Sequence, residues 1–455
     1  MANSLPAVLN LKPEEVDSVE KRGTYRVCVV GCGLRGISYA LAFAEAGYKV
    51  ICADADQSVV KRLSKGVAQL GNREVEGRLR SFVRAGQLNA TNELKSAVSQ
   101  SDIVILAVSA KIDAKKNADY AEVENTCKQV GAALSRGSLV VYGGIAGFGF
   151  IEGVVKEALE NTSGFKAGEA LGLAYNPMQD SVTQDMKLVG EQELKIAADD
   201  KLSLSSAAVI FGTIAKKGVK IFPSVRMAEL AALLAAAKRD AGVALANELA
   251  VFCEHAGVDY AEVLKLLDGD ACESSCSPTI AEENSRDEAY LLLESAENLN
   301  VKLRLSKLVR QINEDMVKHA VNLMHEALRR NDRTLGRARV ALLGTVKSGT
   351  AASVLIQMLA AKGAKVSLYD PAGSGNEDVE IARSLRRTLS EAVEGADCVV
   401  FLNGHEQLRR LSLKRLRALM RTPAALVDLA GIIDPSSAEE EGFTYRGLGR
   451  GVWKK

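Results

Sequence analysis

The segment from Arg26 to Asp56 has the residue types and the spacing that dinucleotide binding requires. It contains Gly31, Gly33 and Gly36 in the pattern G-x-G-x-x-G, directly after a short apolar run. In such a pattern the first glycine allows a tight turn, the second lets the backbone approach a pyrophosphate, and the third lets helix and strand pack closely. The N-terminus of the following helix attracts the phosphate charge. The pattern therefore predicts a phosphate-binding turn between a strand and a helix.

Asp54 stands near the end of the next apolar run, where a ribose-binding acid belongs. Its carboxylate can accept hydrogen bonds from both hydroxyls of an adenosine ribose, and its negative charge disfavours a 2′-phosphate. We therefore expect NAD rather than NADP. The alternative is a glycine-rich turn that serves packing alone, but strand, turn, helix, strand and acid in this order favour nucleotide binding. The other predicted cofactor contacts are Leu34, Arg35, Val108 and Ser109.

Apolar runs that would hold this turn in a sheet recur along the first half of the chain. They occupy residues 101–110, 137–145 and 169–177, between stretches of helical character. Apolar runs without alternation are typical of strands buried on both faces of a parallel sheet. Residues 23–222 are therefore predicted to form a doubly wound, NAD-binding Rossmann domain, after an N-terminal extension at residues 1–22.

A long alanine-rich helix is predicted from residue 225 to residue 257, with Gly257 as its C-cap. Small residues allow helices to approach closely, so we expect this helix to pack in a domain core or a dimer core. We predict a homodimer through it. With further helices up to about residue 330, it forms the predicted central helical domain, residues 223–330. The apolar stripe of the long helix comprises Met227, Leu230, Leu234, Ala237, Ala241, Leu245, Leu249 and Phe252.

A second Rossmann-like segment begins at Arg339 and belongs to the predicted C-terminal domain, residues 331–455. It repeats the order strand, glycine turn, helix, strand and acid, but its turn has only Gly344 and Gly349. This turn, with Lys347, could bind a nucleotide, or the segment could be another α/β layer. The predicted fold class is therefore α/β: two Rossmann-like doubly wound domains joined by a long central helix and a helical middle domain.

Composition and charge argue against several other classes of protein. The 58 basic and 57 acidic residues are balanced, so there is no global bias toward nucleic acid or anionic membrane. No apolar run reaches the ~18 residues of a membrane span, and the N-terminus lacks the pattern of a secretory signal. Cys272 and Cys276 have no second Cys/His pair at ligand spacing, so no metal site is predicted. We expect a cytoplasmic protein without a nucleic-acid or membrane partner.

The order of these segments resembles that of the nucleotide-sugar dehydrogenases: the UDP-glucose, GDP-mannose and, in particular, UDP-N-acetylmannosamine dehydrogenases. The resemblance covers about Tyr25 to Gly451. No single segment is diagnostic, but their order and spacing together are. The matching segments are GCGLRG (31–36), SDIVILAV (101–108), YNP (175–177), ALANELA (244–250), CSP (276–278), KGAKVSLYDP (362–371) and GLGRG (447–451).

The resemblance implies oxidation of the primary alcohol of a nucleotide-activated sugar to a carboxylate, in two NAD-dependent steps. Cys276 stands where the family carries a cysteine that captures the aldehyde as a thiohemiacetal, which is then oxidised to a thioester and hydrolysed. Lys347 and Arg450 are the predicted contacts to the nucleotide sugar.

Three positions depart from the family's catalytic pattern. Its lysine and asparagine on the central helix correspond to Ala232 and Ala236, and its acid after Asn-Pro corresponds to Met178. Loss of one oxyanion donor typically lowers a rate by a factor of ~10² to 10³. Two hypotheses follow: an active enzyme in which other residues supply these groups, or a catalytically impaired NAD-binding homologue that acts as a regulatory or partner subunit. The candidate replacements are Asn176, Asp180 and Lys238.

Overall fold

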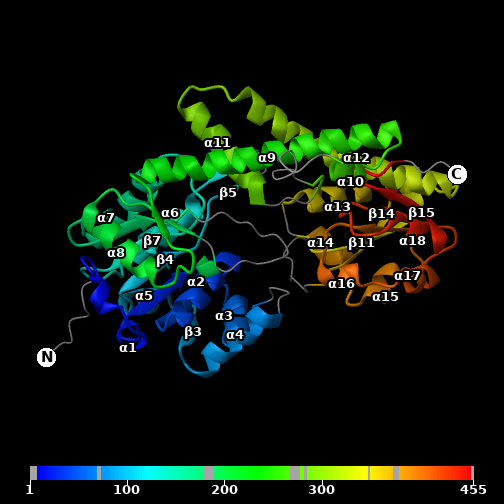
Figure 1. Cartoon of the computed structure of the whole chain (residues 1–455). Coiled ribbons are helices and arrows are strands. Elements are labelled where there is room, and N and C mark those ends of the chain that lie inside the picture. Colours follow the sequence, from blue (N-terminus) through cyan, green and yellow to red (C-terminus); the bar gives the residue numbers. More distant parts are fainter. Residues whose placement is uncertain are drawn as a thin grey trace. The chain divides into compact units, whose positions relative to one another are not determined.

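The chain divides into two compact units (Figure 1). Unit 1 comprises residues 1–236 and 290–301, and unit 2 comprises residues 237–289 and 302–455. The predicted central helical domain is thus shared between them. The computed structural model describes residues 8–68, 73–113, 115–177, 189–191, 193–266, 277–280, 284–346, 349–371 and 379–451.

A six-stranded parallel sheet in the order β3-β2-β1-β4-β7-β8 forms the centre of unit 1. The order of strands reverses between β1 and β4, and such a reversal opens a crevice at the carboxyl ends of the strands. The predicted doubly wound fold is therefore confirmed for this unit. The strands are β1 (Arg26–Val30), β2 (Lys49–Ala53), β3 (Leu88–Thr91), β4 (Ile103–Leu106), β7 (Leu139–Tyr142) and β8 (Gly172–Tyr175).

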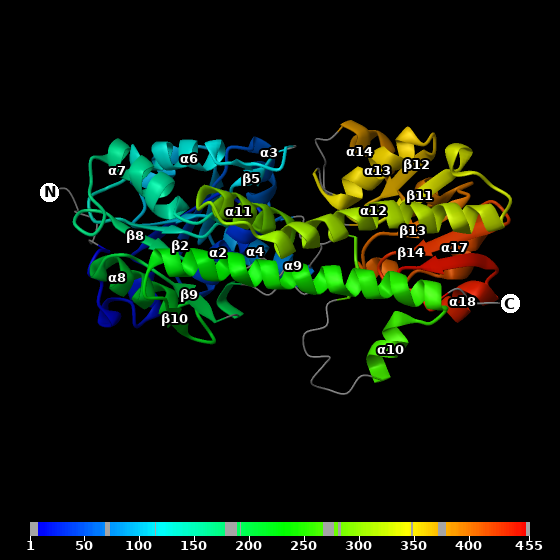
Figure 2. The ribbon, with the colours of Figure 1, turned by 90° about the horizontal axis from the view of Figure 1, so that it is seen from above.

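Helices cover both faces of this sheet because alternate residues of its strands enter different cores. Val27 and Val29 of β1 pack with α2, α4 and α8, whereas Cys28 and Val30 pack with α5, α6 and α7. Figure 2 shows α6 and α7 on one side and α8 on the other. The helices and remaining strands of unit 1 are α1 (Val19–Arg22), α2 (Leu34–Glu45), α3 (Gln57–Leu63), α4 (Arg73–Arg84), α5 (Leu94–Ser99), β5 (Lys111–Ile112), β6 (Ala118–Asp119), α6 (Ala121–Gly131), α7 (Glu157–Ser163), β9 (Leu194–Ile196), α8 (Lys201–Gly212) and β10 (Val219–Ile221), with short 3-10 helices at Pro13–Glu15 and Val189–Glu191 and a π-helix at Ile151–Lys156.

The predicted long helix is α9 (Val225–Ala256), which begins in unit 1 and ends in unit 2. Gly257 follows it with a φ of +75°, the left-handed conformation of the predicted C-cap. The predicted apolar stripe does not enter a core of its own chain, since Leu234 is 54% exposed and Phe252 is 68% exposed. The helix itself does pack in cores of its own chain through other residues, among them Ala228 and Ala250. The residues that α9 buries lie on its other faces, among them Ala228 and Leu233.

Unit 2 contains a five-stranded parallel sheet in the order β12-β11-β13-β14-β15. Helices α12 and α13 pack on one face, and α15, α17 and α18 on the other (Figure 1). This confirms the second Rossmann-like unit. Its elements are α10 (Tyr260–Leu266), α12 (Arg304–Arg330), a 3-10 helix at Leu335–Arg337, β11 (Arg339–Leu343), α13 (Ala351–Ala361), β12 (Lys365–Tyr369), α14 (Val379–Ser384), α15 (Leu389–Val393), β13 (Cys398–Phe401), α16 (Glu406–Arg409), α17 (Leu413–Leu419), β14 (Ala424–Asp428), α18 (Pro435–Glu440) and β15 (Phe443–Gly447), and α11 (Asn284–Asn298) begins in unit 2 and ends in unit 1.

Candidate functional site

The glycine turn lies between β1 and α2, at the crevice of the unit 1 sheet. Gly31 has a φ of +86°, and its N–H donates to Ala53 O of β2 at 2.9 Å. A Cβ on Gly36 would lie 1.9 Å from Gly31 O, so no larger residue fits between helix and strand. Gly33 caps α2 and is exposed, with nothing within 4 Å of where its Cβ would stand. A diphosphate can therefore reach the backbone N–H groups at this helix N-terminus.

Asp54 follows β2, and its carboxylate is fixed beside the turn. Its Oδ2 accepts from Cys32 N at 2.7 Å, and its Oδ1 accepts from Asp56 N at 2.9 Å. A carboxylate offers about four acceptor sites, so two backbone bonds leave room for ribose hydroxyls. The same charge repels a 2′-phosphate. This geometry fits NAD.

The other side of the crevice is formed by the segments that follow β4 and β7. The Oγ of Ser109, after β4, accepts a hydrogen bond from the Arg35 guanidinium and another from Ile145 N, the latter at 3.3 Å. Arg35 is almost fully buried, although it lies in the first turn of α2. Val108 lies against Gly31, where a Cβ would stand 2.8 Å from its Cγ1. Arg35, Val108 and Ser109 of the predicted cofactor contacts thus lie near the switch point, and Leu34 is the first residue of α2.

A buried glutamate supports the segment after β7. The carboxylate of Glu229 on α9 accepts from Gly149 N and Ile151 N, both at 2.8 Å, and Ser295 Oγ accepts from Phe148 N at 3.0 Å. Burial raises the pKa of Glu229 to about 7, against the opposing effect of its two backbone donors. Sequence reasoning did not assign this residue. The sequence feature that could have identified Glu229 is a carboxylate within an alanine-rich, otherwise apolar stretch.

The glycine turn of unit 2 repeats part of this geometry after β11. Gly344 N donates to Tyr369 O at 3.0 Å, and Thr345 Oγ1 donates to Asp370 Oδ1 at 2.8 Å. Asn403, after β13, donates from Nδ2 to Thr345 O at 3.0 Å. Lys347 lies outside the described residues. The turn places hydroxyl, carboxylate and amide groups at the carboxyl ends of three neighbouring strands.

The C-terminal turn is bound to α9 and α10. Arg450 donates to the carboxylate of Asp259, a residue only 6% exposed. Gly449 N donates to Glu254 Oε1 at 2.7 Å, and Gly449 O accepts from Tyr260 N at 2.8 Å. The predicted substrate contact Arg450 therefore already takes part in an ion pair that anchors the turn.

Three family models match the chain in sequence order. They are the NAD binding domain of the UDP-glucose/GDP-mannose dehydrogenase family over residues 25–201, its central domain over residues 226–315, and its UDP binding domain over residues 349–435. The chain belongs to the UDP-glucose/GDP-mannose dehydrogenase family. NAD is the cofactor of this dehydrogenase family member, in agreement with the position of Asp54 beside the glycine turn of unit 1.

Individual relatives match nearly the whole length of this family member. The UDP-N-acetyl-D-mannosamine dehydrogenase of Pyrococcus horikoshii is 26% identical over 94% of this chain and 99% of that protein. The UDP-glucose 6-dehydrogenase of Pseudomonas aeruginosa is 26% identical, with coverage of 93% and 97%. The solved structure of UDP-D-ManNAc dehydrogenase from Pyrococcus horikoshii has a TM-score of 0.78 at 25% identity, covering 93% of this chain and 99% of that chain.

The positions that we predict to depart from the family's catalytic pattern lie partly within the described structure. Ala232 is partly buried on α9, and Ala236 has no exposed surface. Lys238, a candidate replacement, is exposed on the same helix. The predicted catalytic residues Cys276 and Asp180 lie outside the described residues, as does Met178.

Asn176, a third candidate replacement, is 1% exposed at the end of β8. Its Oδ1 accepts from the Tyr39 hydroxyl, and its Nδ2 donates to Lys195 O at 2.6 Å. The amide therefore ties α2, β8 and β9 together. This arrangement favours a structural role for Asn176 over stabilisation of an oxyanion.

A second residue that sequence reasoning did not assign is Asn247 on α9, which has no exposed surface. Its Oδ1 accepts from Thr279 N at 2.9 Å, and its Nδ2 donates to Thr279 O at 3.3 Å and to Asn313 Oδ1 at 2.9 Å. It therefore holds both backbone groups of a residue three positions after Cys276. Its sequence signal was a polar side chain within the matching segment ALANELA.

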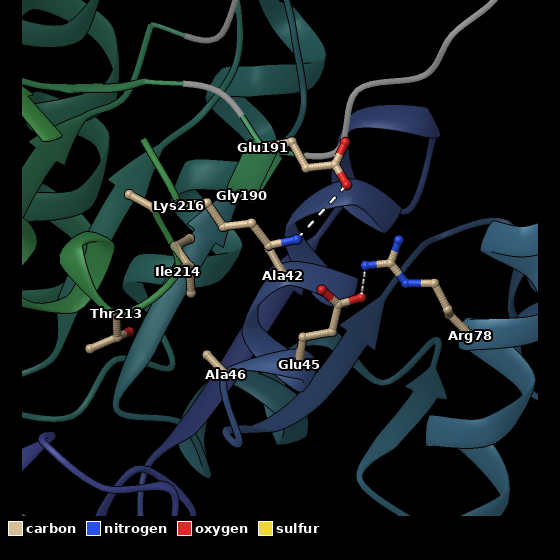
Figure 3. A pocket seen from close by; sticks show the side chains of 10 residues that line it. Ala42, Glu45, Ala46, Arg78, Gly190, Glu191, Thr213, Ile214 and Lys216 are labelled. Carbon is tan, nitrogen blue, oxygen red and sulfur yellow. Dashed lines mark hydrogen bonds and ion pairs between the residues drawn. The ribbon is translucent and has the colours of Figure 1, made fainter. Parts of the chain in front are cut away.

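A cavity of about 180 Å³ in unit 1 lies at the far end of α2 from the glycine turn (Figure 3). Arg78 pairs with Glu45 in it, and Lys216 lies 3.9 Å from Glu191. These charges compensate each other, and we assign this cavity no ligand. Within the described part of the chain, no group of three potential metal ligands occurs, and no helix is long and apolar enough to cross a bilayer.

Proposed function

We propose that the chain is an NAD-dependent 6-dehydrogenase that oxidises a UDP-activated hexose or N-acetylhexosamine to its carboxylate. The observation that carries this proposal is the glycine turn of unit 1, beside which Cys32 N–H fixes the carboxylate of Asp54. The match of three consecutive domains to one dehydrogenase family supports the substrate class. Lys347 and Arg450 remain the proposed contacts to the nucleotide sugar.

Cys276 is the proposed nucleophile. NAD, when bound, supplies the hydride acceptor for both oxidations. The primary alcohol is first oxidised to an aldehyde, and the thiolate of Cys276 adds to the aldehyde carbon while the oxygen takes a proton. Oxidation of this thiohemiacetal gives a thioester, and water then releases the carboxylic acid and the free thiol. Asn247 supports this proposal because it anchors the backbone just after the cysteine.

The two alanines of α9 at the predicted catalytic positions favour a second function. Alanine at positions 232 and 236 offers no side-chain donor for a developing oxyanion, and Ala236 is fully buried. We therefore keep as the alternative a catalytically impaired NAD-binding homologue that acts as a regulatory or partner subunit.

The exposed stripe of α9 supports a homodimer. Met227, Leu234, Leu245 and Phe252 are each more than half exposed, although they lie at the helical spacing of a packed face. We propose that a second copy covers them. Leu245→Glu should then yield monomers in analytical ultracentrifugation, whereas Lys238→Glu, an exchange of one charge for another, should leave the dimer largely intact. A monomeric wild type would contradict this assembly. We also propose a cytoplasmic location, since all six cysteines that the structure describes are buried free thiols.

NADH formation with a panel of UDP- and GDP-sugars tests the proposed activity. We expect NADH from at least one UDP-sugar, a severe loss of turnover in Cys276→Ser, and little change in Cys272→Ser. Calorimetric titration with NAD belongs to the same experiment. If NAD binds but no sugar yields NADH, the dehydrogenase proposal fails and the partner-subunit alternative is supported.

A further inference from the structure

Ser109 receives two hydrogen bonds at the carboxyl end of the unit 1 sheet. One donor is the guanidinium of Arg35, which follows β1, and the other is the backbone N–H of Ile145, which follows β7. Ser109 itself follows β4, which lies between those strands. Its hydroxyl therefore joins three consecutive segments that border the crevice.

Neither partner of Ser109 can accept a hydrogen bond. A guanidinium and a backbone N–H are donors only, whereas a serine hydroxyl has two acceptor lone pairs and one proton. Both lone pairs are therefore engaged by Arg35 and Ile145. Within the described residues, no hydrogen bond uses the hydroxyl proton of Ser109. The hydroxyl is thereby left as a donor whose rotation the two incoming N–H groups restrict.

The position of Ser109 indicates which part of the cofactor lies near this proton. Asp54, at the end of β2, marks the adenosine side of the crevice, and the diphosphate belongs at the α2 N-terminus. The dinucleotide crosses the switch point between β1 and β4, so its nicotinamide half lies on the β4 side, where Ser109 stands.

We propose that Ser109 donates its hydroxyl proton to an oxygen of the nicotinamide riboside, and that Arg35 is the positioning residue that keeps this hydroxyl in the donor orientation. The inference rests on NAD binding at the glycine turn of unit 1. Arg35 suits this role because it is 9% exposed and so holds a restricted position. Tyr142 in turn holds the backbone of Ile145, since its hydroxyl donates to Ile145 O at 3.1 Å.

Calorimetric titration with NAD and with ADP tests the role of Ser109. ADP contains the adenosine and the diphosphate but not the nicotinamide riboside. Ser109→Ala should weaken NAD binding by about three- to tenfold, the range for one hydrogen bond, and leave ADP binding within about twofold of wild type. Ser109→Thr and Ser109→Val form a matched pair of nearly equal side-chain volume. The threonine variant should bind NAD more tightly than the valine variant. This pair decides the matter if the alanine variant does not fold.

A double-mutant cycle tests Arg35. Arg35→Met keeps much of the apolar stem, and it should weaken NAD binding but not ADP binding. Because Arg35 acts through Ser109, the double variant should bind NAD about as well as Ser109→Ala alone. Additive losses would overturn the positioning role. Equal losses of ADP and NAD, or an alanine variant that binds NAD like the wild type, would overturn the proposal, whereas wild type that binds neither ligand would overturn the cofactor assignment itself.

Discussion

The two Rossmann-like units share the beginning of their glycine turns. In unit 1, Gly31 N donates to Ala53 O, and in unit 2, Gly344 N donates to Tyr369 O. Both glycines have positive φ, and both acceptors are the last residues of the second strand. An acid, Asp54 or Asp370, follows that strand in each unit. The order of elements thus produces the same frame twice.

The units differ in the hydrogen-bond donor of this acid and in how closely the following helix approaches the turn. Asp54 accepts from the backbone N–H of Cys32, whereas Asp370 accepts from the side chain of Thr345. In unit 1 the helix begins at Leu34 and passes over the turn with Gly36 in contact. In unit 2 it begins only at residue 351, after a longer turn. We infer that unit 1 presents backbone to a diphosphate, while unit 2 presents side chains to its ligand.

The largest expected difference between the units concerns the last glycine of each turn, Gly36 in unit 1 and Gly349 in unit 2. Gly36→Ala places a Cβ against the backbone of Gly31 and should destabilise the protein by about 3 kcal/mol or more. At Gly349 there is open space, and alanine there should cost only about 1 kcal/mol, from its left-handed conformation. Denaturant unfolding measures both variants. Equal losses would contradict the close approach in unit 1.

Each unit contains a buried carboxylate that accepts hydrogen bonds from the backbone of a loop. Glu229 in unit 1 and Asp428 in unit 2 have no exposed surface, and each accepts two backbone N–H groups. Burial raises the pKa of both. A raised pKa means that the folded state binds the proton more tightly, so its contribution to stability falls as the pH rises.

For Glu229, stability relative to Glu229→Gln should fall by about 3 kcal/mol between the ordinary pKa and about 7, and then stay level. Asp428→Asn should reveal a dependence of the same sign. Unfolding free energies measured from about pH 4 to pH 8 test both. A difference between wild type and Glu229→Gln that is independent of pH would show that this carboxylate is not desolvated.

The smallest expected effect concerns the two acids that follow the second strands. Asp54→Asn keeps the shape but removes the charge, so NAD binding should weaken by about 10- to 100-fold. Asp370→Asn, the matched change in unit 2, should leave NAD binding unchanged and weaken UDP binding instead. Titrations of both variants with both ligands separate the two sites. If Asp370→Asn weakened NAD binding as strongly as Asp54→Asn, the assignment of NAD to unit 1 would fail.

The burial of their residues explains which strands could be predicted from the sequence. β4 and β7 are buried throughout, so their apolar runs were recognisable. β3 (Leu88–Thr91) is an edge strand in which only Leu88 is fully buried, so it has no such run. In α9, periodicity identified the apolar stripe but not its environment, because a helical repeat does not show which surface covers it.

The site was predictable only where its chemistry is local in sequence. The glycine turn and Asp54 lie within one strand–helix–strand unit, so their spacing identified them. The bond between Arg35 and Ser109 spans 74 positions, and it depends on β4 lying beside β1. Glu229 is 80 positions from Gly149 and lies in a different element. Such contacts follow from the fold and have no local pattern.

The most direct test of the central claim is the amount of NADH formed when a limiting UDP-sugar is converted completely with excess NAD. Oxidation of an alcohol to a carboxylate removes two hydrides, so we predict two NADH per sugar, together with the sugar carboxylate in the product. The activity should disappear in Cys276→Ser. Absence of NADH from every UDP-sugar, in a preparation that binds NAD by calorimetry, would contradict the account and identify the chain as a non-catalytic partner.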